Sequence, residues 1–260
     1  MNPESIYVTH WGTTGPRVVM VHGSAQGSRN GGDHHFSRQR QLGEAGWQLL
    51  VPDRPGHGRT PAPGRPDDAQ ADGAWVAEML GSGAHLVGHS FGGCVALAAA
   101  AKRPAAVFSL TLIEPGMQKL AMNQPVVRRF GLQLLAAIYL SFSAAQRARR
   151  FAELVRIPPE VGGGRDEAEL RAMGQGIKQL KVPSAKELQQ QLDVIREAGI
   201  PLLVVTGGWS PAFEATADTV ASAGGGRRLV IPCEHHFPQL ASDQFNEALA
   251  AFMTSSPSKK

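Results

Sequence analysis

Short apolar runs recur along the chain, and the stretches between them have the spacing of helices. The runs IYVTHW, RVVMVHG, WQLLVPD, AHLVGHS, FSLTLIEP, PLLVVTGG and RRLVIP predict strands. Several are apolar at every position, which is typical of strands buried on both faces of a parallel sheet. Residues 36–45, 91–102, 214–222 and 237–253 read as helices. Alternation of strand and helix predicts an α/β fold, a doubly wound and mostly parallel sheet.

One interval breaks this alternation. From Met117 to about Glu197 the sequence has helical patterns and no convincing strand. A capping box, Ser184 to Glu187, marks the start of its last helix, which Gly199 and Pro201 end. This interval is too long for an ordinary connection. We therefore predict a core of residues 1–116 and 198–254, a helical cap of residues 117–197 that covers the sheet as a lid, and a disordered tail, 255–260.

The composition is that of a globular protein and limits the possible partners. Of the 260 residues 42% are hydrophobic and 18% charged, and the net charge is only +4. The arginines at 128–129 and 147–150 have few aromatic neighbours, which favours a solvated helix face over nucleic-acid binding. The N-terminus lacks a signal-peptide pattern, and the apolar stretch 132–142 is too short to span a bilayer. We expect a soluble cytoplasmic protein without nucleic-acid or membrane partners.

No sequence pattern indicates a metal or another cofactor. Cys94 and Cys233 lie far apart and have neither disulfide-framework nor zinc-ligand spacing. We also find no phosphate-binding loop and no dinucleotide fingerprint. We therefore expect that the protein uses no cofactor.

The stretch Gly88-His89-Ser90-Phe91-Gly92 fits the pattern G-x-S-x-G. A strand-like run precedes it and a helix-like run follows, which is the context that a nucleophilic serine requires in this pattern. In such a turn the hydroxyl lies at the carboxyl end of the sheet, and the helix amides favour negative charge there. An ordinary turn serine is the alternative. The context favours Ser90 as a nucleophile.

A serine hydroxyl needs a base and a site for the developing oxyanion. The loop after the last predicted strand contains His235 and His236, and we choose His236 as the base, with His235 as the alternative. The amide of Phe91, directly after the serine, is the first predicted oxyanion donor. The amide of Ser24, in the loop after RVVMV, is the second.

Together these residues resemble the α/β-hydrolase superfamily. The resemblance rests on His22-Gly23, on Asp53-Arg54-Pro55-Gly56-His57-Gly58, on the serine turn through Gly93 and on His236-Phe237-Pro238. It implies that Ser90 is the nucleophile, that His236 is the base and that the loop 22–24 forms half of the oxyanion hole. It also implies an α/β-hydrolase fold with the cap inserted after strand 6 of the family's core. The loop after Asp53 is usually structural in such proteins.

The acid departs from the commonest family pattern. Many relatives have an aspartate after the strand that here is residues 201–206, but this chain has Gly207-Gly208-Trp209-Ser210 there, and Glu214 and Asp218 lie further on. Glu114 instead ends the strand after the nucleophile helix, at the same edge of the sheet. Haloalkane dehalogenases and a zearalenone lactonase are members of the superfamily in which this strand supplies the acid. We predict Glu114 as the acid, against the simpler reading of a turn-capping glutamate.

The resulting hypothesis is a serine hydrolase that cleaves a carboxylic ester or a lactone. Leu132, Leu135, Ile138 and Phe142 of the cap read as cap core or pocket lining, which favours a hydrophobic or aromatic small-molecule substrate. One alternative is a ligand receptor that keeps the fold and turns over little, and another is a C–C bond hydrolase. The sequence does not indicate the substrate or the oligomeric state.

Overall fold

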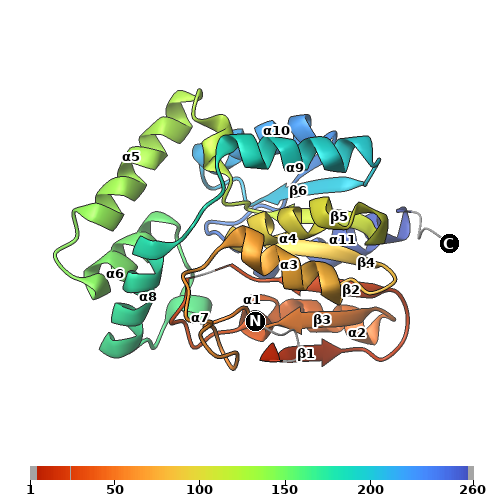
Figure 1. The fold of residues 1–260 in the computed structure, drawn as a ribbon, viewed down its shortest axis with the longest axis horizontal. Helices are drawn as coiled ribbons and strands as arrows, with labels where there is room; N and C mark the ends of the chain where they lie inside the picture. Colours follow the sequence, from red (N-terminus) through yellow and green to blue (C-terminus); the bar gives the residue numbers. More distant parts are fainter. Residues whose placement is uncertain (1–4, 24, 257–260) are drawn as a thin grey trace.

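The computed structural model describes residues 5–23 and 25–256. In this part of the chain a seven-stranded sheet has the order β1-β3-β2-β4-β5-β6-β7 (Figure 1). The strands are β1 (Val8–Trp11), β2 (Arg17–Val21), β3 (Gln48–Pro52), β4 (Ala84–His89), β5 (Val107–Ile113), β6 (Leu202–Thr206) and β7 (Arg227–Val230). β1 is antiparallel to β3, and the other neighbours are parallel. The predicted mostly parallel sheet is confirmed.

The central strands are buried on both faces, as their apolar runs predict. Every residue of β4 and of β6 is buried. In the register of the sheet Gly88 lies opposite Val21 of β2 and Leu112 of β5. The carboxyl ends of these parallel strands therefore meet at one edge of the sheet, where loops can bring distant side chains together.

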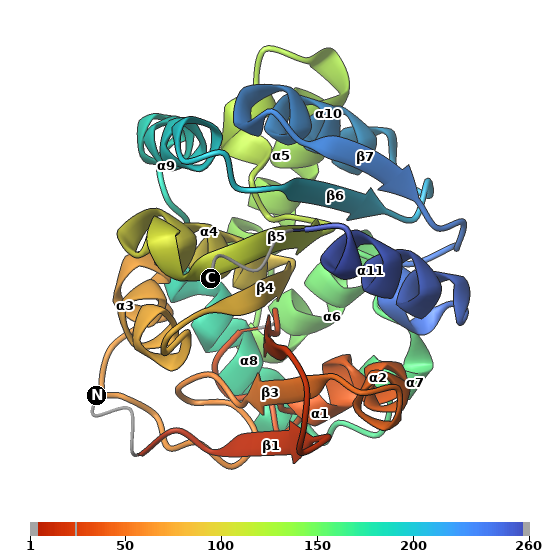
Figure 2. The same cartoon turned by 90° about the vertical axis from the view of Figure 1, so that its right-hand side faces the viewer.

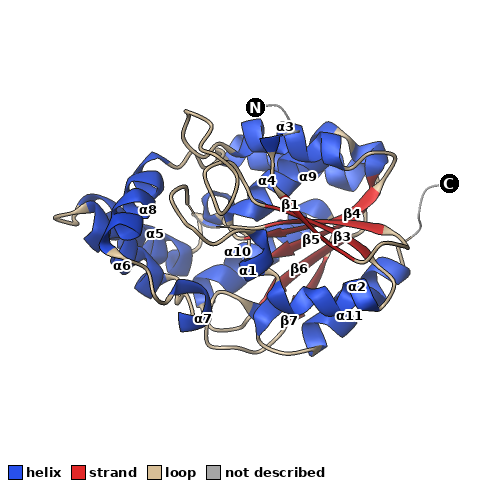
Figure 3. Cartoon of the chain, turned by 90° about the horizontal axis from the view of Figure 1, so that it is seen from below, coloured by secondary structure: helices blue, strands red, loops and turns tan. Residues whose placement is uncertain are grey.

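Helices cover both faces of the sheet (Figures 2 and 3). On one face lie α3 (Ala69–Met79), α4 (Phe91–Lys102), α9 (Ala185–Glu197) and α10 (Pro211–Gly224), and on the other α1 (Gly32–His35), α2 (Arg40–Glu44) and α11 (Gln244–Thr254). Each layer has its own apolar cluster: Leu86, Leu97 and Val220 belong to the first, and Phe36, Val205 and Leu249 to the second. The doubly wound α/β architecture is confirmed.

A further group of helices lies beyond the carboxyl ends of the strands. It consists of α5 (Pro125–Tyr139), α6 (Ala144–Leu154), α7 (Pro159–Gly162) and α8 (Glu167–Gln179), seen on the left of Figure 1. The Phe130 ring of α5 packs edge-on against the Phe213 ring of α10, with 5.3 Å between their centroids. Met173 and Ile177 of α8 pack against Ala25. These apolar contacts hold the group against the core.

The insertion differs from the predicted range 117–197 at its end. The capping box of Ser184 and Glu187 is present, but Leu188, Leu192 and Ile195 of α9 are fully buried in the same apolar cluster as α4 and α10. A helix that connects two parallel strands of one sheet must pack on its face, and α9 does so between β5 and β6. The helical group beyond the sheet therefore ends before Ser184.

Several predicted elements have other bounds in the structure. Residues 91–102 form α4 as predicted, but residues 36–45 contain a 3₁₀ turn, Ser37–Gln39, followed by α2. The predicted helix 237–253 opens instead with a 3₁₀ turn, Pro238–Leu240, and α11 begins only at Gln244. Helix α3 was not predicted, because buried residues on several sides, including Gly73, Trp75 and Val76, leave no single apolar stripe.

Some apolar side chains of α5 and of the segment between α5 and α6 are exposed rather than internal. Leu132 is 68% exposed and Phe142 is 95% exposed, so neither belongs to a cap core. Ser255 and Ser256, which we expected in a disordered tail, extend the end of α11, where both hydroxyls donate to the carbonyl of Phe252. Residues 257–260 lie outside the described part. Among the described helices, none combines the length and the apolar composition that crossing a membrane requires.

Candidate active site

Ser90 stands in the turn between β4 and α4 with a backbone conformation that is rare for a residue other than glycine. Its φ is 57° and its ψ is −124°. The amide of Ser90 donates to the carbonyl of Ile113 at 2.8 Å, and its own carbonyl accepts from the amides of Gly93 and Gly116 at 2.9 and 3.1 Å. Strain of this kind persists only where the surroundings hold it, and it is concentrated at functional sites. The predicted strand–turn–helix context is present.

The glycines around Ser90 allow very close packing. A Cβ on Gly88 would lie 2.5 Å from the carbonyl oxygen of Gly92, and a Cβ on Gly92 would lie 2.3 Å from that of Val21. A Cβ on Gly23 would lie 2.7 Å from the Cβ of Ser90. The loop after β2 therefore passes directly beside the serine.

Of the two predicted oxyanion donors, Phe91 and Ser24, only Phe91 is among the described residues. Phe91 is the first residue of α4, so its amide has no carbonyl partner within its own helix, and the residue lines the same cavity as Ser90. Ser24 lies outside the described residues. Of the described residues on either side of it, Gly23 adjoins Ser90 and Ala25 lines the cavity. The role of both amides stays a prediction.

Glu114 directly follows β5 and is fully buried. Its Oε1 accepts hydrogen bonds from the amide of Gly207 at 2.7 Å and from the indole Nε1 of Trp209 at 3.2 Å. Its Oε2 lies 3.4 Å from Nδ1 of His236. Burial raises the pKa of Glu114 to about 7, although the hydrogen bond from Gly207 acts in the opposite direction. The loop where many relatives have their acid thus supplies donors to a carboxylate on the neighbouring strand.

His236 lies in the loop after β7 and is almost completely buried. Its ring centroid is 4.7 Å from that of Phe213 and 5.0 Å from that of His89. Burial lowers the pKa of His236 to about 3, so the ring is neutral at neutral pH and able to accept a proton. Ser90 and His236 line one cavity, without a hydrogen bond between the hydroxyl and the imidazole. Such bonds often tighten only when substrate is bound.

The facing atoms of Glu114 and His236 have no other partner. Neither Oε2 nor Nδ1 makes a hydrogen bond within the described part of the chain, and at a separation of 3.4 Å they form a close polar contact. A small shift would convert the contact into a hydrogen bond from Nδ1 to the carboxylate, which fixes the tautomer whose Nε2 accepts a proton.

The other candidates of the sequence analysis lie elsewhere. The ring of His235 accepts a hydrogen bond at Nδ1 from the amide of Phe237, and among the described residues the cavity is lined by His236 and not by His235. Glu214 and Asp218 both bind Arg228 on the outer side of α10, at 2.6 and 2.8 Å. Of the carboxylates named from the sequence, the structure brings Glu114 to the histidine.

Sequence reasoning missed a row of buried histidines that leads to His236. Successive ring centroids from His57 to His22, His35, His89 and His236 are 5.0, 5.1, 6.0 and 5.0 Å apart. Burial lowers the pKa of each ring, that of His57 to about 4. Their sequence spacing gave no signal, because they come from five separate segments of the chain.

A buried ion cluster supports the loop beside Ser90, and sequence reasoning assigned it no partners. The guanidinium of Arg54 is fully buried between the carboxylates of Asp67 and Asp72. It also lies 4.7 Å from the centroid of the Phe91 ring and donates to the carbonyl of Gly23 at 3.4 Å. One cation therefore contacts both segments that carry the predicted oxyanion donors.

The cavity at Ser90 has a volume of about 480 Å³. Apolar side chains of the helical group form much of its wall, among them Leu134, Leu135, Ile138, Phe151 and Ile177. An apolar wall of this kind suits an apolar ligand. Among the described residues no group of three or more His, Cys, Asp or Glu side chains is arranged to hold a metal ion.

The fold and the site together define an α/β protein with a mostly parallel sheet and a strained serine turn at the end of a central strand. A sequence model described as "Alpha/beta hydrolase family" matches residues 18–248. That match covers most of the chain, so the protein belongs to the alpha/beta hydrolase family.

Comparison with individual proteins gives partial matches. The chain is 35% identical to Lipase LipV of Mycobacterium tuberculosis over 118 residues, which are 43% of this chain and 42% of that protein. It is 32% identical to the 2-hydroxy-6-oxononadienedioate/2-hydroxy-6-oxononatrienedioate hydrolase of Burkholderia vietnamiensis over 139 residues, 52% of this chain and 48% of the other. The matches span less than two thirds of the length of these relatives.

Among solved structures, the esterase EaEST from Exiguobacterium antarcticum superposes with a TM-score of 0.71 and 20% identity, over 96% of each chain. At this identity the likeness shows the shared fold.

Proposed function

We propose that this protein is a serine hydrolase that cleaves a carboxylic ester or a lactone through an acyl-enzyme on Ser90. One arrangement carries the proposal: the strained serine lines the same cavity as His236, whose Nδ1 faces the buried carboxylate of Glu114 at 3.4 Å. The partial match to a protein named as a lipase supports ester hydrolysis.

The residues divide the reaction between them. Ser90 Oγ attacks the carbonyl carbon while neutral His236 takes the hydroxyl proton, and the carbonyl electron pair moves to the oxygen. The amides of Phe91 and Ser24 stabilise that oxyanion. When the carbonyl re-forms, the alcohol leaves with the proton from His236. A water molecule then attacks the acyl-enzyme in the same way and releases the acid. Glu114 orients the imidazole and stabilises its protonated form.

The cavity wall favours a small substrate with a hydrophobic or aromatic part. Leu134, Leu135 and Ile138 of α5 line the same cavity as the reacting serine and carry no charge. We propose that α5, α6 and α8 act as the cap that closes over this substrate.

Turnover of p-nitrophenyl esters of increasing acyl length by the wild type and by Ser90→Ala tests the proposal. We expect turnover in the wild type and loss of nearly all of it in the variant. A fluorophosphonate should also form an adduct on the peptide that contains Ser90, detected by mass spectrometry. Equal turnover in both proteins would overturn the chemistry. A folded wild type with neither turnover nor adduct would identify a ligand receptor instead.

A C–C bond hydrolase is the second candidate, because the Burkholderia relative is named as a hydrolase of 2-hydroxy-6-oxononadienedioate and 2-hydroxy-6-oxononatrienedioate, substrates with no ester bond in their names. A serine–histidine site is compatible with both reactions. Loss of the dienoate absorbance of such a substrate, with a specificity constant above that for every ester, would favour this candidate.

A further inference from the structure

A polar corner inside the cavity has no part in the chemistry described so far. It is formed by Arg165, which precedes α8, and by His35 at the end of α1, and both residues line the same cavity as Ser90. The side chain of Arg165 is 6% exposed and His35 is 2% exposed. Buried polar groups are normally paired, so this corner requires a partner.

The charge of Arg165 is only partly compensated. Its nearest carboxylate is that of Glu169, with 3.6 Å between Nε and Oε1, and this Nε makes no hydrogen bond within the described chain. Glu169 is held more closely by Arg29, whose Nε lies 3.0 Å from Oε2 and whose amide donates to Oε1 at 3.1 Å. Two guanidinium groups thus share one carboxylate, and the pair leaves a net positive charge.

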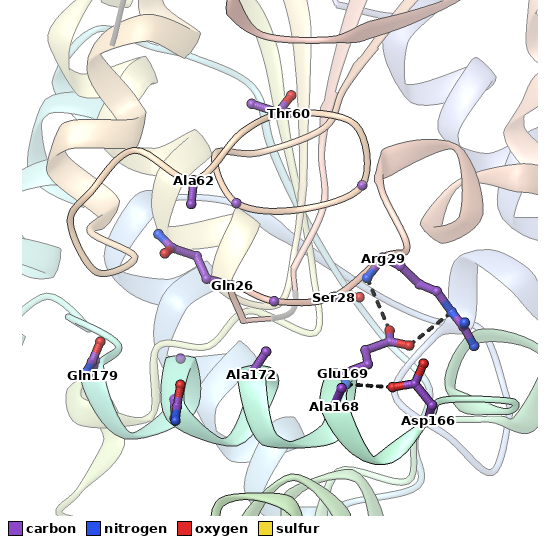
Figure 4. Close-up of a pocket in the computed structure, with 15 residues that line it drawn as sticks. Gln26, Ser28, Arg29, Thr60, Ala62, Asp166, Ala168, Glu169, Ala172 and Gln179 are labelled. Atoms are coloured by element: carbon purple, nitrogen blue, oxygen red, sulfur yellow. Dashed lines mark hydrogen bonds and ion pairs between the residues drawn. The ribbon is translucent and has the colours of Figure 1, made fainter.

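That positive charge is on the cavity side. Arg29 and Glu169 line a separate, open groove along α8, where Figure 4 shows them bound to each other. Arg29 is half exposed there, so water solvates it. Arg165 is buried and lines the inner cavity instead. A cation in a low-dielectric wall that shares its nearest carboxylate with a second cation attracts an anion strongly.

His35 adds a second unpaired group to this corner. Neither ring nitrogen makes a hydrogen bond with any described residue, although a neutral imidazole always has one donor and one acceptor. The charge of Arg165 contributes to the lowered pKa of His35, after burial and the neighbouring His89 and His57, so the two side chains interact. The ring of His35 is 6.0 Å from that of His89, which adjoins Ser90 in the chain. The corner therefore lies near the reacting serine.

We propose that Arg165 and His35 form a subsite for a carboxylate group of the substrate. Under the proposed function, on which this step rests, the preferred substrate is an ester with an apolar acyl chain and an anionic carboxylate at its far end. The planar fork of Arg165 matches a carboxylate, and the N–H of His35 adds a donor. The apolar side chains that line the same cavity accommodate the methylene chain. A neutral chain end would leave the ring of His35 without a hydrogen-bond partner among the described residues. It would also leave the charge of Arg165, which contacts Glu169 and donates to the carbonyl of Val161, only partly compensated.

Turnover with matched esters tests this subsite. The substrates are mono-p-nitrophenyl esters of linear dicarboxylic acids from succinate to suberate, each paired with the ester whose terminal carboxylate is replaced by an isopropyl group. At the best chain length we expect kcat/KM for the anionic ester to exceed that of its partner about tenfold or more. Arg165→Met should abolish this preference, and Arg165→Lys should restore part of it. Arg171→Met is the matched control, because this exposed guanidinium of α8 contacts Glu167 rather than Glu169, and it should keep the preference.

A binding measurement on Ser90→Ala makes the test independent of turnover. By calorimetry, hexanoate should bind about tenfold more tightly than neutral hexanamide, and Arg165→Met should remove the difference. Equal affinities in the parent and the variant, together with equal turnover of the paired esters, would overturn the subsite and leave the proposed function standing. Selective hexanoate binding in a protein that turns over no ester would support the subsite and refute the proposed function.

Discussion

Glu114 and His236 face each other across the carboxyl edge of the sheet, with 3.4 Å between Oε2 and Nδ1. The other oxygen of Glu114 accepts from the amide of Gly207, so the carboxylate is held on the side away from the histidine. An acid that is fixed in this way can orient the imidazole only through Oε2. The assignment of Glu114 as the acid can therefore be tested by replacing its carboxylate with an amide.

Glu114→Gln should lower kcat for the best ester by about 10²- to 10⁴-fold, because the amide no longer stabilises the protonated imidazole in the correct tautomer. Steady-state kinetics on p-nitrophenyl esters measures this effect. The matched control is Asp218→Asn, which removes a largely exposed carboxylate that binds Arg228, and it should change kcat little. The reverse order of effects would show that the acid was assigned to the wrong strand.

The pH dependence of turnover should report on the same pair. Burial raises the pKa of Glu114 to about 7 and lowers that of His236 to about 3. The groups titrate together, so the pair takes up one proton as the pH falls through about 7, and either the orienting carboxylate or the accepting imidazole is lost. We expect kcat/KM to rise with pH and to level off above this value.

In Glu114→Gln the carboxyl group no longer titrates, so the acid limb of this profile should move to lower pH. Profiles of kcat/KM for the wild type and the variant check this. An acid limb at the same pH in both proteins would mean that another group controls it.

The site illustrates what sequence can and cannot indicate. The Ser90 turn is a local feature, so the sequence predicts it. Its conformation depends on the neighbouring glycines: Gly88 packs against the carbonyl of Gly92, and Gly92 packs against the carbonyl of Val21. Glu114 follows from the rule that carboxyl ends of parallel strands meet at one edge of a sheet. The partners Gly207 and Trp209 do not follow, since their contacts depend on the exact course of the loop after β6.

The helical insertion shows a second limit. Helical spacing identified α9 and its capping box, but spacing gives only the apolar face of a helix and not the surface that covers it. The face of Leu188 and Leu192 packs on the core, whereas Leu132 and Phe142 of the insertion are exposed. His35 and Arg165, which belong to separate segments of the chain, carried no local signal at all.

The row of buried histidines should make stability depend on pH. The folded-state pKa of His57 is lowered from its ordinary value of 6.5 to about 4, and those of His22, His35 and His89 are lowered as well. The unfolded chain therefore binds more protons below pH 6.5, and the free energy of unfolding falls as the pH falls through that value toward 4. Glu114 acts in the opposite direction, because its folded-state pKa is raised. Its single contribution to the pH dependence is smaller than the sum of those of the four histidines.

Urea titrations at successive pH values measure this slope, to which each histidine contributes at most about 1.4 kcal/mol per pH unit. His57→Gln should make the slope shallower by up to one such contribution. The matched control His10→Gln changes a histidine on the edge strand β1 outside the buried row, and it should leave the slope unchanged. A slope that is unaltered by His57→Gln would show that the ring is already protonated in the folded protein.

Gly23→Ala should damage the site by crowding Ser90. The added Cβ would lie 2.7 Å from the Cβ of Ser90 and 3.0 Å from the carbonyl oxygen of His89, so either the serine or the loop after β2 must shift. Overpacking of this kind costs about 1–3 kcal/mol, and a displaced Ser90 loses alignment with His236. We expect a lower free energy of unfolding in urea and a lower kcat for esters.

Gly131→Ala is the matched control, because Gly131 lies inside α5, where an added Cβ would have Met122 Cε as its nearest neighbour at 3.5 Å. Alanine is the better helix former, so this variant should gain about 0.5–1 kcal/mol of stability. If Gly23→Ala instead matched Gly131→Ala in both stability and turnover, the loop after β2 would have room beside the serine. In that case the close approach on which the second oxyanion donor depends would not exist in solution.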